Sequence, residues 1–181
     1  QQRNLASVLG SEIAEGRRIF IEEKFNGNGR TCATCHRLDN NHTIDPNYIA
    51  KLPKSDPLFV AETKPGLANL ENPKLLRELG LILANIDGFD KPGVLRSVPH
   101  TLALSKSMAT ELLSNGGEFA LDEEFANALG WSGDGSVGNG SLREFAIGAV
   151  VQHFPKSLAR TEGVDFRLPT DQELNALQAY M

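Results

Sequence analysis

The pentapeptide Cys32-Ala33-Thr34-Cys35-His36 constrains the fold of this chain more than any other feature of its sequence. Its two cysteines are the only ones among 181 residues, and two residues separate them. A framework of several disulfides is therefore excluded, and so is a zinc site with four cysteine ligands. A chain of this length can bury a hydrophobic core without covalent cross-links.

The spacing of the motif indicates a cofactor. Two thiols placed as C-x-x-C can each form a thioether with a vinyl group of one haem, and the histidine that follows can bind the iron. The sequence therefore predicts one covalently bound haem c, attached through Cys32 and Cys35. His36 is the predicted axial ligand.

Three kinds of site without haem could also use such a motif. A thioredoxin-like redox pair would follow a strand, and no strand is predicted before Cys32. A zinc site needs two further ligands, and the remaining histidines, His42, His100 and His153, do not form a second ligand pair. A chance pair of structural cysteines is the third alternative, and the spacing favours it least.

Composition narrows the classes of partner. Hydrophobic residues make up 40% of the chain, charged residues 23%, and the formal net charge is -5. This balance argues against nucleic acid and against an anionic membrane surface, and it favours a redox protein with a basic docking face. No apolar run is long enough to span a bilayer. The first residue is Gln1 and not Met, which indicates a processed or trimmed product.

Hydrophobic spacing predicts helices over residues 11–25, 72–83 and 141–154, and a final helix that starts at Pro169 or Thr170. Ser11 and Ser141 are expected to cap the first and third of these helices. Residues 39–64 read as a long loop with a short helix near Tyr48, and residues 101–113 as partly helical. No strand pattern appears, so we expect an all-α domain with long loop insertions.

The first and last predicted helices carry a resemblance. Gly16 and Phe20 precede the cysteine motif, and the final helix carries Leu174, Leu177 and Tyr180. This arrangement resembles the class I cytochrome c domain, in which the first and last helices cross. The resemblance implies that the small Gly16 allows close approach, and that Phe20 and Tyr180 fill the contact. We therefore expect one mono-haem domain over 1–181, with a fragment of a longer multi-haem protein as the alternative.

The same resemblance bears on the second axial ligand. Class I cytochromes usually supply a methionine from a loop well after the haem motif, and the chain has only Met108 and Met181. Met108 is the predicted ligand, because Met181 is terminal and lies on the apolar face of the last helix. A core-filling role is the alternative for Met108. His153 and His100 are the alternative ligands.

Two further residues are predicted around the haem. A metal-bound histidine normally donates its other ring N–H to an oxygen acceptor. In class I cytochromes this acceptor is a proline carbonyl after the motif, which implies Pro46, with Pro53 as the second choice. Arg96 is a candidate partner for a haem propionate, because a guanidinium fits the geometry of a carboxylate. A solvated surface arginine is the alternative.

A weaker resemblance covers residues 96–154. Arg96 to Pro99, then Gly133-Asp134-Gly135, then the helix from Ser141 are similar to the haem domains of bacterial di-haem cytochrome c peroxidases. The tripeptide before Asp134 contains no Met or His, so the ligand position of that family is not transferred here.

These observations predict an electron carrier with one His/Met-ligated haem c. It is expected in the periplasm, because haem is attached covalently outside the cytoplasm. The alternative is a haem domain or subunit of a peroxidase-like oxidoreductase. Only in that case would the chain be part of an enzyme. That family needs two haems, and the chain has one haem motif.

Overall fold

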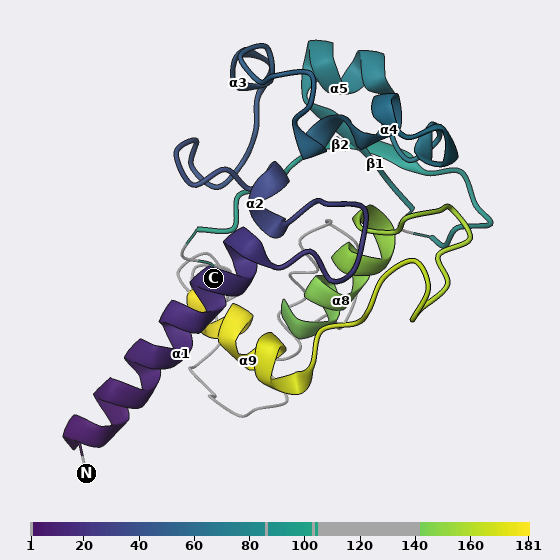
Figure 1. Ribbon diagram of the computed structural model, residues 1–181. Coiled ribbons are helices and arrows are strands. Elements are labelled where there is room, and N and C mark those ends of the chain that lie inside the picture. The colour runs from purple at the N-terminus through teal and green to yellow at the C-terminus, as the bar shows by residue number, and fades with distance from the viewer. Residues whose placement is uncertain (1, 86, 103, 105–141) are drawn as a thin grey trace, which may run out of the picture.

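A long N-terminal helix and a shorter C-terminal helix cross at one side of the molecule (Figure 1). The computed structural model describes residues 2–85, 87–102, 104 and 142–181. In chain order its elements are α1 (Gln2–Glu22), α2 (Cys32–Cys35), α3 (Pro46–Ile49), η1 (Pro57–Phe59), α4 (Val60–Thr63), η2 (Pro65–Leu67), α5 (Pro73–Leu79), β1 (Leu81–Ala84), β2 (Val94–Ser97), α8 (Leu142–His153) and α9 (Asp171–Tyr180). None of the helices in these described ranges is both long and apolar enough to cross a membrane.

The crossing of α1 and α9 depends on Gly16. A Cβ atom at this position would lie 2.6 Å from the carbonyl carbon of Ala176 and 2.8 Å from the Cβ of Tyr180. Only glycine lets the two backbones approach so closely. One turn further along α1, the rings of Phe20 and Tyr180 are 5.3 Å apart and fill the contact. The predicted packing through Gly16, Phe20 and Tyr180 is therefore confirmed.

Several predicted helices are confirmed, with changes at their ends. The short helix near Tyr48, the helix up to His153 and the final helix capped by Thr170 are all present. The first helix starts at Gln2, so Ser11 lies inside it and the prediction that Ser11 caps it is wrong. Ser141 and most of residues 101–113, Met108 included, lie outside the described residues.

The prediction that the chain contains no strand is wrong. The helix predicted over 72–83 stops at Leu79, because Gly80 adopts a left-handed conformation with φ of 67°. Leu81–Ala84 then pairs as an antiparallel strand with Val94–Ser97. Four residues are too few to reveal a strand by alternation, and three of them are leucine or isoleucine, which also fit a helical pattern. The regular structure of the described residues is therefore mostly helical with one small sheet, and the class I cytochrome c fold stays a prediction.

Two hydrophobic clusters form the main core. The first joins α1, α8 and α9 and contains Ile19, Phe20, Phe25, Val150, Phe154, Phe166, Ala176 and Leu177. The second lies under the hairpin and contains Ile44, Ile49, Leu58, Phe59, Leu76, Ile82 and Val98. Cys32 packs against the first cluster and Cys35 against the second. The short helix α2 therefore sits at the junction of the two clusters.

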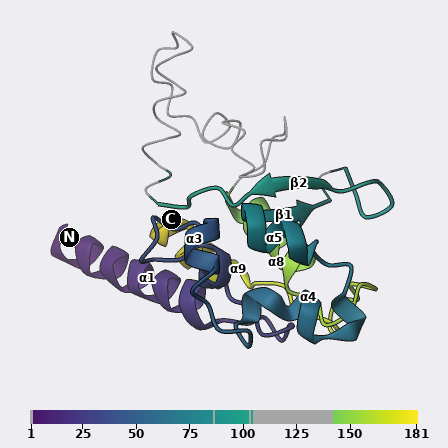
Figure 2. The same cartoon turned by 90° about the horizontal axis from the view of Figure 1, so that it is seen from above.

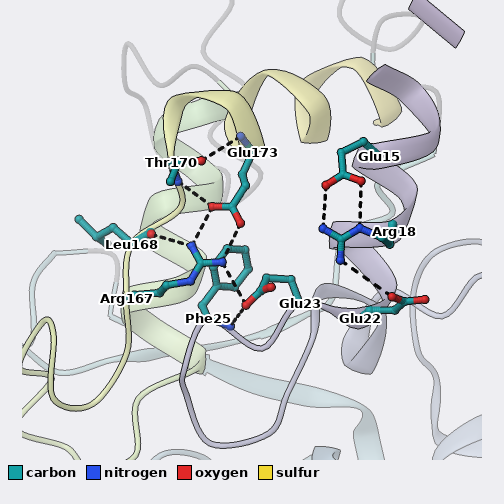
Figure 3. A network of polar contacts seen from close by, with 9 residues as sticks. All are labelled: Glu15, Arg18, Glu22, Glu23, Phe25, Arg167, Leu168, Thr170 and Glu173. Carbon is teal, nitrogen blue, oxygen red and sulfur yellow. Dashed lines mark hydrogen bonds and ion pairs between the residues drawn. The ribbon is translucent and has the colours of Figure 1, made fainter. Parts of the chain in front are cut away.

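An ionic network fastens the start of α9 to the end of α1 (Figure 3). Arg167 donates to both carboxylate oxygens of Glu173, at 2.7 and 2.6 Å, and its Nη2 lies 3.2 Å from Glu23. The hydrogen bonds from Arg167 are the main reason why the pKa of Glu173 falls to about 2. Glu173 also accepts the backbone N–H of Thr170, which closes the cap of α9. The network ties the start of α9 to the residue that follows α1.

Candidate functional site

The cysteine motif forms a single helical turn, α2. The backbone N–H of Thr31 donates to Thr34 Oγ1 at 2.9 Å, which stabilises the start of this turn. The N–H of His36 donates to the carbonyl of Cys32 at 3.0 Å, which ends it. Residues three apart in a helix lie on the same face, so Cys32 and Cys35 present their sulfur atoms to the same side. His36 follows directly beside them.

Both cysteines are free thiols in an apolar environment. Burial raises the pKa of Cys32 to about 12 and that of Cys35 to about 11. Redox-active cysteines show the opposite perturbation, because their environment stabilises the thiolate. The apolar surroundings of the two thiols, which raise their pKa, therefore disfavour a thioredoxin-like redox pair. Within the described parts of the chain, no three side chains of His, Cys, Asp or Glu converge so as to hold a bare metal ion.

A cavity of about 490 Å³ lies against this turn, and Cys32, Cys35 and His36 all line it. This volume falls in the range of roughly 300–1,000 Å³ that is usual for small-molecule and cofactor sites. Apolar side chains make up much of its wall, among them Phe20, Phe25, Ile82, Ala84, Val98, Phe145, Ala149, Val150, Phe154 and Leu177. In Figure 2 the hairpin of β1 and β2 lies over α8, and both the hairpin and α8 contribute to the wall.

The imidazole of His36 is oriented by the backbone. Its Nδ1 lies 3.1 Å from the carbonyl oxygen of His42. A tight loop brings this carbonyl back to the ring: Asn41 and His42 both have φ of 54°, and the N–H of His42 donates to the carbonyl of Arg37 at 2.8 Å. When Nδ1–H donates to this carbonyl, Nε2 keeps the lone pair that a metal requires.

The electrostatics of His36 also suit a ligand. Burial lowers its pKa to about 4, although the backbone carbonyls of His42 and Pro99 oppose the shift. The ring is therefore neutral at pH 7, which is the form that binds a metal ion. The side chain of His42 is buried as well, with its ring 5.8 Å from that of Phe20.

Pro46 does not orient His36, so that prediction is wrong. The carbonyl of Pro46 accepts the N–H of Ala50 at 3.0 Å, as expected for a residue in the first turn of α3. The carbonyl of Pro53, the second choice, accepts the N–H of Asp56. The loop after the motif returns to the imidazole within six residues, so His42 reaches the ring before the chain arrives at either proline.

The other predicted residues differ in where they lie. Arg96, on β2, is half-buried and lines the cavity, as its predicted role toward a propionate requires. His153, the last residue of α8, lines the cavity too, and so does Met181. His100 is exposed and lies outside the cavity wall. Met108 belongs to the residues that the structure does not describe.

Sequence reasoning missed a buried ion pair beside the motif. Nη1 of Arg30 lies 3.0 Å from Oε1 of Glu71, and both side chains are almost fully buried. Arg30 also donates to the carbonyl of Leu58 at 2.8 Å, and Glu71 accepts the N–H of Leu83 at 2.7 Å. The pair thus links the loop just before the cysteine motif to residues 57–58 and to β1. In the sequence, the only indication of this pair is that Arg30 lies two residues before Cys32. No neighbouring residue distinguishes Glu71 from the other acidic residues.

No protein-family model matches the chain, and no curated protein or solved structure matches it. The assignment of this site therefore rests on its own geometry and chemistry.

Proposed function

We propose that this protein binds one haem c covalently and transfers single electrons outside the cytoplasm. One observation carries the proposal: two half-buried thiols and an imidazole line the same largely apolar cavity, and a backbone carbonyl lies within hydrogen-bond distance of that imidazole. The residues of the site fit the group. Cys32 and Cys35 would hold it by thioether bonds, and His36 would bind the iron. The haem supplies an iron centre that changes charge by one unit.

The chain contributes three properties to this chemistry. The apolar wall excludes water, which shapes the reduction potential of a bound metal centre. The His42 carbonyl holds His36 in one orientation and raises its basicity as a ligand. Arg96, on β2 in the cavity wall, would neutralise a carboxylate of the bound group. The net charge of -5 suits a redox partner with a basic docking face.

Covalent attachment is tested by producing the chain in a host that attaches haem outside the cytoplasm. We expect the intact mass to increase by one haem, and the alkaline pyridine spectrum to show two thioether bonds. Cys32→Ala and Cys35→Ala should each shift that spectrum to the form with one thioether, and the double variant should lose covalent haem. Thr34→Ser, inside the motif, keeps the hydroxyl that Thr31 bonds and should behave like the natural protein. An unmodified mass for the natural protein would contradict the proposal.

Electron transfer is tested on the haem-loaded protein. We expect a reversible one-electron redox titration, a low-spin ferric spectrum and no binding of carbon monoxide to the reduced form. A high-spin ferric spectrum with rapid reaction toward hydrogen peroxide would contradict the carrier. It would favour the peroxidase-like alternative, which the resemblance over residues 96–154 supports.

A further inference from the structure

His153 occupies a distinctive position at the end of α8. Its side chain is half-buried and lines the same cavity as His36. Two imidazoles therefore share one cavity, one supplied by the cysteine motif and the other by a helix more than a hundred residues later.

A buried carboxylate lies beside the ring of His153. Its Nδ1 lies 3.7 Å from Oε1 of Glu71, and the side chain of Glu71 is 0% exposed. Among the described residues, Glu71 is the only carboxylate at ion-pair distance from this ring. A histidine that merely fills a core satisfies both ring nitrogens within the protein. A histidine that binds a metal typically directs one nitrogen to a carboxylate and leaves the other to the metal.

The carboxylate itself cannot turn away from His153. Arg30 holds its Oε1 at 3.0 Å, and the backbone N–H of Leu83 donates to its Oε2 at 2.7 Å. Glu71 is thus a buried acceptor held in a fixed position by its two donors.

The backbone of His153 is also held in place. Nδ2 of Asn28 donates to the carbonyl of His153 at 2.9 Å and to that of Pro155 at 3.1 Å. The preceding residue, Gln152, exchanges hydrogen bonds with Asn85 at the end of β1, at 3.0 and 3.1 Å. These contacts fix the end of α8 against the loop before the cysteine motif and against the hairpin.

From these contacts we propose that His153 is the second axial ligand of the haem, held by the Arg30–Glu71 pair. The proposal rests on the haem c function proposed above and replaces Met108 as the sixth ligand. Two imidazole ligands give a lower reduction potential than one imidazole and one thioether. The iron would have no open position, which suits a carrier and not a peroxidase.

Spectroscopy of the haem-loaded protein tests the ligand directly. We expect the ferric protein to be low-spin, with the electron paramagnetic resonance of two imidazole ligands and without a methionine–iron charge-transfer band. His153→Gln should remove that resonance, leaving high-spin iron or a new methionine band. Met108→Leu should change nothing. His100→Gln, at an exposed histidine outside the cavity wall, is the matched control and should also change nothing.

Two results would overturn the proposal: a methionine–iron band that Met108→Leu abolishes, or a His153→Gln spectrum identical to that of the natural protein. If His153→Gln yields no folded protein, Glu71→Gln decides the matter, because glutamine keeps an acceptor for Arg30. Loss of the anionic partner of His153 should then raise the midpoint potential of the haem and shift the g values of its electron paramagnetic resonance. Unchanged g values would refute His153 as the ligand. Absence of covalent haem in the natural protein would instead refute the proposed function itself, so the two failures are distinguishable.

Discussion

Replacing Gly16 with alanine should destabilise the protein, although alanine is the better helix former. Gly16 lies where α1 meets α9, and an added Cβ would lie 2.6 Å from the carbonyl carbon of Ala176. Carbon atoms in contact are normally about 3.5–4.0 Å apart, so the helices would have to separate by roughly 1 Å. The obstructing atom belongs to the backbone and cannot rotate aside.

The expected magnitude follows from two opposing terms. Overpacking at a close contact costs about 1–3 kcal/mol. The change from glycine to alanine within a helix recovers about 1 kcal/mol. We therefore expect the free energy of unfolding of Gly16→Ala to fall by about 0–2 kcal/mol, with the whole cost arising at the helix crossing.

Gly10 provides a control in the same helix. It is exposed, and a Cβ added there would meet nothing within 4 Å. Gly10→Ala should therefore stabilise the protein by about 0.5–1 kcal/mol. Urea unfolding of the haem-loaded proteins, followed by far-ultraviolet circular dichroism, measures both changes. Equal stability of the two variants would refute the close crossing of α1 and α9.

Two further predictions concern charged groups. Arg30→Met should lower the free energy of unfolding by about 3–5 kcal/mol, because it leaves the Glu71 carboxylate buried without its cation. Urea unfolding measures this loss, and Arg18→Met, which removes an exposed ion pair, is the control and should cost little. A similarly small loss in both variants would contradict the buried pair. For Glu173, the pKa is lower in the folded protein than the ordinary value of 4.5, so its stabilising effect is full above about pH 4.5 and is lost as the pH falls toward 2. Unfolding measured against pH should show this acid loss, Glu173→Gln should flatten it, and an unchanged acid profile in that variant would exclude the pairing with Arg167.

The sequence alone predicts the features that depend on near neighbours. The positions of Cys32 and Cys35 place two sulfur atoms on one side of a helical turn, whatever surrounds them. The final helix starts at its cap, Thr170, because a hydroxyl there can accept a backbone N–H three residues later. Gly16 and Tyr180 lie far apart in the chain, and their contact was expected only through the resemblance to class I cytochromes.

The tertiary structure decides what surrounds the motif. The carbonyl that orients His36 belongs to His42 and not to Pro46, because two left-handed residues turn the chain back early. Glu71 meets Arg30 and His153 only when segments separated by 41 and 82 positions converge, and no local pattern encodes that meeting. A motif can specify which atoms a chain brings to a cofactor. The groups that orient, neutralise or oppose those atoms are set by long-range packing, and only the folded chain shows them.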